Sequence, residues 1–231
     1  GGAGDPDNSV WAGILASHLR RGATGVNLFD YAGAPRGAVA GYVAALEAVD
    51  PTTLSRDAAF AYWANFYNAL TIQVVQEAWP VSSILRIGGS LINPGPWREK
   101  RVRVAGEDLS LDDIEHGIMR PVWGDARVHY AVNCASIGCP NLKETPWTAA
   151  RLGADLDAGA RAYVNHPRGA TVAGARLTVS SIYDWFQEDF GGTDAGVISH
   201  LRQYAEPGLR SALDGINRIA GDDYDWSINA A

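Results

Sequence analysis

The segment 57–79, DAAFAYWANFYNALTIQVVQEAW, is the feature that most constrains the fold of this 231-residue chain. Phe60, Trp63, Tyr67 and Leu70 recur at the spacing of an α-helix. Almost every other position is also apolar or aromatic, so the helix has no face suited to water. We therefore expect a long helix buried at the centre of the protein, beginning at Ser55.

Two asparagines, Asn65 and Asn68, interrupt this apolar segment. A buried amide costs free energy unless it forms hydrogen bonds. Both side chains must therefore find partners. The sequence leaves open whether Asn65 satisfies backbone groups or binds a substrate.

Bulk properties exclude some classes of protein. The chain is 47% hydrophobic and 19% charged, which supports a sizeable core. Its net charge of −7 disfavours a nucleic-acid partner, because no basic stripe exists to neutralise phosphates. No apolar run reaches the ~18 residues that a membrane span requires.

The first residues, GGAGDPDNS, are polar and lack an initiator Met. We expect residues 1–8 to be a flexible N-terminus and an export signal to have been removed. Two nearby cysteines suit an oxidising compartment. The expected location is therefore secreted or periplasmic, with a cytoplasmic location as the alternative.

Further patterns predict several helices and two hairpins. Ser110 to Asp113 has the S-x-x-D pattern of a helix start. Asp184, Glu188 and Asp189 are predicted to form a solvated helix face. The helices are expected at 8–20, 36–49, 111–120, 182–190, 195–204 and 207–220, and the hairpins at 101–109 and 170–179. Because regular βαβ alternation and long linkers are absent, we predict a single α+β domain over 1–231, with helices packed on a small antiparallel sheet.

Both cysteines lie in the segment 128–142, VHYAVNCASIGCPNL. Val128, Tyr130 and Val132 alternate with less apolar residues, which predicts a half-buried strand over 127–133. The cysteines follow in a loop that contains Gly138 and Pro140.

A first hypothesis makes Cys134 a nucleophile. A reactive thiol needs a base or another group that lowers its pKa. On an extended strand at ~3.3 Å per residue, His129 would lie roughly 16 Å away, so direct pairing is excluded. His116 is the preferred base, because Asp112, His116 and Arg120 are spaced four apart on one helix face.

Two other hypotheses use the same residues. Four intervening residues allow Cys134 and Cys139 to reach the ~4.4–6.8 Å Cα separation of a disulfide, which would mainly rigidify the loop. Together with His116 and His129, the cysteines also offer four metal ligands. This spacing matches no known zinc pattern, so neither a metal nor another cofactor is expected.

Five strings along the chain resemble successive motifs of the DUF547 family, a domain of unknown function found in bacteria and in plant proteins. The strings are YWANFYNAL, LSLDDIEHGIMR, HYAVNCASIGCPNL, SIYDWFQEDFGG and YDWSIN, spanning about 50 to 229. By fold resemblance the family is grouped with papain-like and transglutaminase-like cysteine peptidases. The resemblance therefore implies a papain/transglutaminase-like core.

That superfamily places a nucleophilic Cys at the start of a buried helix, facing a His on a strand. The resemblance puts Asn65 roughly where that thiol is expected, while His129 resembles the strand histidine. Either the thiols of the CASIGC loop have taken over the chemistry, or the site is not that of a thiol protease.

The leading hypothesis is a thiol-dependent hydrolase or acyltransferase that attacks an amide or thioester bond of a peptide or small molecule. Cys134 would be the nucleophile, with His116 or His129 as the base and Glu115 beside them. An amide of Asn65 or Asn133 would stabilise the oxyanion. The full expected site comprises Asn65, Tyr67, Glu115, His116, Arg120, His129, Asn133 and Cys134. The alternative is a non-catalytic module that binds a peptide or protein, with a structural Cys134–Cys139 disulfide.

Overall fold

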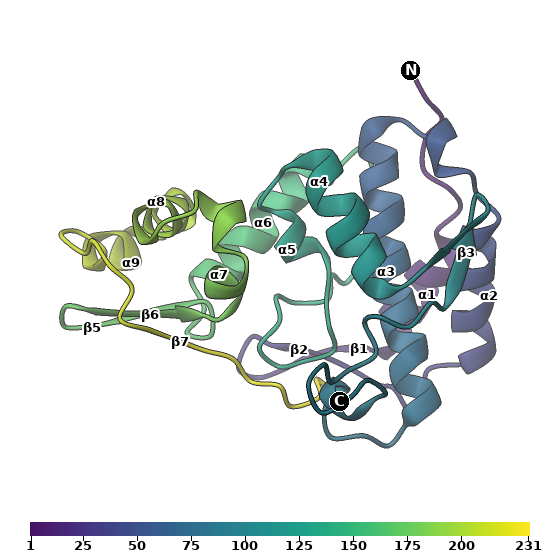
Figure 1. Cartoon of the computed structure of the whole chain (residues 1–231), viewed down its shortest axis with the longest axis horizontal. Helices are drawn as coiled ribbons and strands as arrows, with labels where there is room; N and C mark the ends of the chain where they lie inside the picture. Colours follow the sequence, from purple (N-terminus) through teal and green to yellow (C-terminus); the bar gives the residue numbers. More distant parts are fainter.

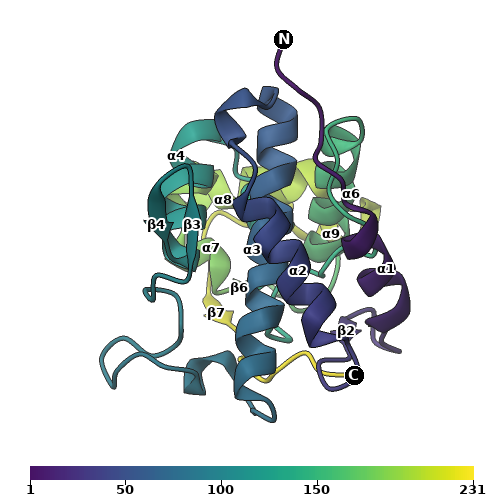
Figure 2. The ribbon, with the colours of Figure 1, turned by 90° about the vertical axis from the view of Figure 1, so that its right-hand side faces the viewer.

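Helix α3 (Arg56–Ala78) runs through the centre of the larger half of the molecule in the computed structural model, which describes residues 1–231 (Figures 1 and 2). The Ser55 hydroxyl accepts a hydrogen bond from the backbone N–H of Ala58 at 3.3 Å and begins the helix. Nearly all side chains from Ala58 to Gln76 are buried. The predicted central helix is therefore confirmed.

The larger half is built around α3. Helices α1 and α2 and two short hairpins surround it, and a cluster of 37 buried residues forms its core. The elements are α1 (Ser9–His18), β1 (Leu19–Arg21), β2 (Asn27–Phe29), α2 (Arg36–Glu47), β3 (Val102–Val104) and β4 (Glu107–Leu109), with 3-10 turns at Pro51–Thr53 and Ile84–Arg86. The predicted helices at 8–20 and 36–49 and the hairpin at 101–109 are confirmed.

The predicted helix at 111–120 forms, but most of it is a π-helix, Asp113–Met119, continued by α4 (Arg120–Trp123). Its start is a capping box. Ser110 N donates to Asp113 Oδ2 at 2.8 Å, and Asp113 N donates to Ser110 Oγ at 3.1 Å. Short π-helical segments are rare and often accompany functional sites.

The prediction of a strand over residues 127–133 is wrong. Residues Val128–Ala131 form a short helix, α5, with turn-like backbone bonds such as His129 N to Ala126 O at 3.3 Å. The alternation of apolar residues gave the wrong prediction because every residue from Val128 to Asn133 is buried. The segment therefore has no exposed face for such a pattern to distinguish from a buried one. The 16 Å separation of His129 from Cys134, which assumed an extended strand, also no longer applies.

The smaller half follows residue 150 and has its own cluster of 15 buried residues. Its elements are α6 (Leu152–Val164), β5 (Ala170–Ala173), β6 (Arg176–Ser180), α7 (Ile182–Trp185), the 3-10 turn Gln187–Phe190, α8 (Asp194–Tyr204), α9 (Pro207–Ala212) and β7 (Gly221–Asp223). Strand β6 pairs antiparallel with β5 and parallel with β7. The predicted hairpin at 170–179 is confirmed, whereas the predicted helices at 182–190 and 207–220 are shorter than expected.

The C-terminal segment joins the two halves. After β7 the chain runs back toward α3 (Figure 1), where Ser136 bridges to Ile228 and Phe29 to Ala230. The three separate sheets are small, so the α+β class is confirmed, although one sheet is mixed. The papain-like core and the single-domain organisation stay predictions. No helix combines the length and apolar character that crossing a membrane requires.

Candidate functional site

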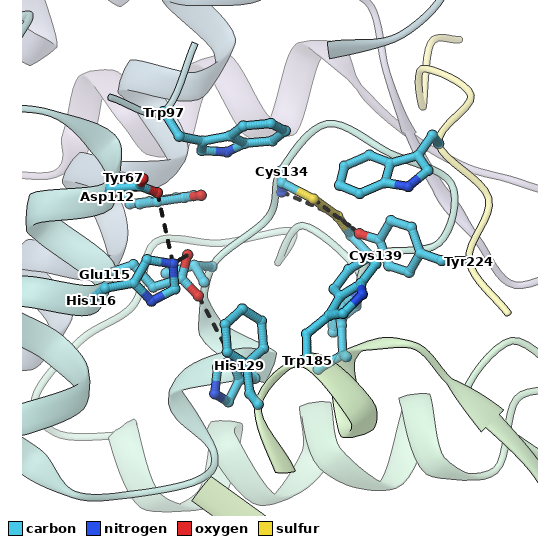
Figure 3. Close-up of a pocket in the computed structure, with 15 residues that line it drawn as sticks. Tyr67, Trp97, Asp112, Glu115, His116, His129, Cys134, Cys139, Trp185 and Tyr224 are labelled. Carbon is cyan, nitrogen blue, oxygen red and sulfur yellow. Dashed lines mark hydrogen bonds and ion pairs between the residues drawn. A yellow bond between two sulfur atoms is a disulfide. The ribbon is translucent and has the colours of Figure 1, made fainter. Parts of the chain in front are cut away.

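A cavity of about 240 Å³ lies where the two halves meet (Figure 3). Its lining comes from α3, the π-helix, α5, the cysteine loop, α7 and the C-terminal segment. The lining residues are Tyr67, Trp97, Asp112, Glu115, His116, His129, Val132, Cys134, Cys139, Pro140, Ile182, Trp185, Phe186, Tyr224 and Trp226. Segments far apart in the sequence therefore build one hollow.

Aromatic rings form much of the cavity wall. The Trp226 ring stacks on Trp185 with centroids 5.5 Å apart, and meets Tyr224 at 4.7 Å and Trp97 at 5.8 Å. The Trp185 side chain is 42% exposed, unusually high for tryptophan. The rings hold one another in place and present fixed surfaces to the cavity.

The π-helix supplies a polar wall. Because His116 Nδ1 lies 3.1 Å from Arg120 Nη1, and a guanidinium only donates, Nδ1 accepts this hydrogen bond. The imidazole proton is then on Nε2, which lies 3.7 Å from Asp112 Oδ1 and 3.8 Å from Glu115 Oε1. The polar stripe of Asp112, His116 and Arg120 predicted from the sequence is thus present.

The His129 ring is held by a hydrogen bond to a carboxylate. Its Nε2 lies 2.6 Å from Asp189 Oδ2, which also accepts from Arg120 Nε at 2.6 Å. Burial lowers the pKa of His129, and Asp189 offsets this only in part. Burial alone would raise the pKa of Asp189, but hydrogen bonds from His129 and Arg120 outweigh it and lower that pKa. The pair is therefore a neutral imidazole donating from Nε2 to a carboxylate.

Glu115 faces the other nitrogen of His129. Glu115 Oε2 lies 3.6 Å from His129 Nδ1, and the carboxyl group is buried. Burial raises the pKa of Glu115, although His116 and Arg120 counteract it. Two carboxyl groups on either side of one imidazole thus have pKa values displaced in opposite directions, an arrangement suited to accepting and releasing protons at the cavity surface.

The sulfur atoms of Cys134 and Cys139 lie on the opposite side of the cavity and are joined in a disulfide (Figure 3). The Tyr224 hydroxyl lies 3.0 Å from Cys134 Sγ and 2.9 Å from Cys139 Sγ. Cys134 N donates to Cys139 Sγ at 3.2 Å. Neither cysteine is free and neither imidazole bonds to sulfur, so a thiolate nucleophile requires reduction of this bridge.

Five residues expected in the site do line the cavity, namely Tyr67, Glu115, His116, His129 and Cys134. Arg120 lies behind the wall, where it binds His116 and Asp189. The two asparagines lie outside the lining. Asn65 donates to Trp147 O at 3.0 Å and accepts from Trp147 N at 2.9 Å. Asn133 donates to Pro140 O at 2.9 Å and accepts from Ala135 N at 2.9 Å.

Sequence reasoning missed several residues of the site. Asp189 was predicted to be solvated, which is wrong: its side chain is only 22% exposed and binds His129 and Arg120. Trp226 was given no role in the site, but it lines the cavity and is half-buried. The signal was available, because these residues lie in the SIYDWFQEDFGG and YDWSIN motifs. Their spacing alone did not indicate that the motifs meet.

The family model described as "Protein of unknown function, DUF547" matches residues 51–164. The resemblance expected from the sequence is thereby confirmed, while the papain-like relationship stays a prediction. Comparison with curated proteins found no match, and comparison with solved structures found none either. No group of three or more His, Cys, Asp or Glu side chains is arranged to hold a metal ion.

Proposed function

We propose that this protein is a ligand-binding module whose aromatic cavity holds a small organic molecule or a side chain of a peptide. The observation that carries the proposal is the cavity itself, in which six aromatic side chains surround a few polar groups. Mostly apolar lining with a few converging polar groups is typical of small-molecule sites.

The disulfide supports a binding role. It ties residues 134 and 139 together, and the Tyr224 hydroxyl bonds to both sulfur atoms. A wall fixed in this way loses little conformational entropy when a ligand binds. A secreted or periplasmic location belongs to the same proposal, because such bridges persist in oxidising compartments.

A fragment screen by ligand-detected NMR tests the proposal. We expect fragments that bind the protein and lose binding in Trp185→Leu, because that ring forms an exposed part of the wall. Trp79→Leu is the matched control, since Trp79 packs against Tyr31 outside the cavity lining. If no fragment binds, or if both variants bind as the parent does, the proposal is refuted.

A second candidate function is thiol-dependent acyl transfer or hydrolysis at an amide or thioester bond. The Cys134 sulfur faces a cavity that also contains two imidazoles and a buried carboxyl group, and this observation favours it. In this proposal an external thiol reductant reduces the bridge to two thiols. A histidine takes the proton of Cys134, the Tyr224 hydroxyl stabilises the thiolate, and its attack on the carbonyl expels the amine or thiol of the substrate.

Alkylation kinetics separate the two candidates. After reduction, a catalytic Cys134 should react with iodoacetamide at neutral pH much faster than free cysteine does, and His116→Ala should slow it. The Cys134→Ser variant identifies which thiol reacts. Reduced cysteines that react no faster than free cysteine would rule out the acyl-transfer function.

A further inference from the structure

We infer that the ligand of the aromatic cavity carries an organic cation of the substituted-ammonium type. This inference rests on the proposed binding function and names the chemical class of its ligand. It follows from the faces of the aromatic rings, the charges of the lining and the size of the hollow.

The aromatic rings offer surfaces that attract positive charge. Three tryptophan rings contribute, and Trp185, Tyr224 and Trp226 meet at angles of 30° to 61°. The rings therefore surround the hollow from several directions and do not lie in one plane. Cations bind over the faces of such rings, tryptophan most strongly, and quaternary ammonium groups are held in cages of this kind.

The charged groups of the lining have the complementary sign. The lining includes the carboxyl groups of Asp112 and Glu115 but no Lys or Arg. The Asp112 side chain points into the cavity (Figure 3) and is 38% exposed. Glu115 lies three residues further along, within the π-helix, and its side chain is 11% exposed.

The Arg120 guanidinium behind the cavity wall already forms ion pairs with other side chains. The Arg120 guanidinium binds Asp189 at 2.6 Å and Glu188 at 2.9 Å. It also donates to His116 Nδ1 at 3.1 Å. The lining itself offers no Lys or Arg to an anion, and an anionic ligand would lie against two carboxyl groups.

The size of the cavity favours a small head group. Sites for drug-sized ligands usually have volumes of about 300–1,000 Å³. At about 240 Å³ this hollow suits a trimethylammonium group with a short chain. A free ligand and the modified side chain of a peptide share this chemistry.

Calorimetric titration with choline, 3,3-dimethylbutan-1-ol and 3,3-dimethylbutanoate tests the inference. The alcohol has the shape of choline with carbon in place of the charged nitrogen, and the acid reverses the charge. We expect choline to bind about tenfold more tightly than the alcohol, and the acid not to bind. A methyl ester of trimethyl-lysine, tested the same way, distinguishes a peptide source from a free ligand.

A charge variant checks that Asp112 is responsible. Asp112→Asn should remove most of the preference for choline over the alcohol. Asp184→Asn is the matched control, because Asp184 is exposed and lies outside the lining, and it should leave the preference unchanged. Circular dichroism shows whether each variant is folded, and the comparison of probes on the parent protein needs no variant.

Two results would overturn the inference. If the alcohol binds as tightly as choline, the ligand is not selected by charge, and the proposed binding function survives without this specificity. If neither choline nor the lysine derivative binds, the inference is refuted, and the fragment screen decides separately about the binding function.

Discussion

Replacing Asp189 by alanine should destabilise the protein strongly, although this residue looks like a surface acid in the sequence. Its Oδ2 atom accepts hydrogen bonds from both His129 Nε2 and Arg120 Nε, each at 2.6 Å. The His129 side chain is only 2% exposed beside Asp189, so removal of Asp189 leaves its N–H without its protein acceptor. A single oxygen atom of Asp189 thus accepts the hydrogen bonds that hold the side chains of His129 and Arg120.

The expected magnitude follows from these contacts. A hydrogen bond to a charged group contributes about 1.5–3 kcal/mol, and a buried donor left unpaired costs about 1–3 kcal/mol. Because Asp189 is 22% exposed and Arg120 keeps its contact with Glu188, we expect Asp189→Ala to lower the free energy of unfolding by about 3 kcal/mol. Asp189→Asn should cost about 1–2 kcal/mol, since one amide oxygen can accept both bonds without the charge.

Urea unfolding at pH 7, followed by tryptophan fluorescence and circular dichroism, measures these values from the shift in midpoint at an unchanged slope. Asp184→Ala is the matched control, because Asp184 is exposed and makes no side-chain hydrogen bond; it should change stability by less than about 0.5 kcal/mol. If Asp189→Ala is no more destabilising than Asp184→Ala, the assigned role of Asp189 is wrong.

The same contacts predict a pH dependence. The pKa of Asp189 is lower in the folded protein than the ~3.9 of a free aspartate. Its contribution to stability is therefore present above that pH and is lost as the pH falls through the folded pKa. Asp189→Asn should consequently lose less stability than the parent on acidification below pH ~4.

Three further changes have defined outcomes. The double replacement of Cys134 and Cys139 by serine should lower the free energy of unfolding by about 2 kcal/mol, the value for so short a closed loop, with little change in far-UV circular dichroism. Glu115→Gln should gain stability relative to the parent as the pH rises above the ~4.3 of a free glutamate, because burial raises the folded pKa of Glu115 and the parent loses stability as this group ionises; equal pH profiles would refute this. His200 Nε2 forms a hydrogen bond with the Tyr130 hydroxyl at 2.7 Å, and burial lowers the pKa of His200 to about 4. The parent should therefore lose up to about 3 kcal/mol between pH 6.5 and 4 through this group, and His200→Gln should lose less over that range in urea unfolding.

Local patterns in the sequence were sufficient to predict most of the helices. The apolar segment at 57–79 has no polar face, so its burial as α3 follows from composition alone. The start at Ser110 forms the expected capping box, because its bonds join residues only three apart. Both features depend on neighbours along the chain.

Features that depend on tertiary contacts were not predictable. The strand predicted at 127–133 became helix α5, because a fully buried segment does not reveal its period through alternation. The π-helix likewise has no sequence rule that would separate it from an α-helix.

The site was predictable in part. His116 was identified from a local polar stripe, Glu115 as its neighbour, and Cys134 from its position after an apolar segment. Asp189 and Trp226 enter the site because the C-terminal half folds back onto the first, and a single sequence does not show which distant segments meet. The hydrogen bonds of Asn65 to Trp147, 82 positions away, have the same origin.

The most direct test of the central claim, that the aromatic cavity is the binding site, uses the indole N–H signals of the eight tryptophans in a two-dimensional NMR spectrum. Titration with choline should shift the signals of Trp97, Trp185 and Trp226, which line the cavity, and leave the other tryptophan signals in place. Shifts confined to tryptophans outside the cavity, or no shifts while calorimetry records binding, would contradict the claim.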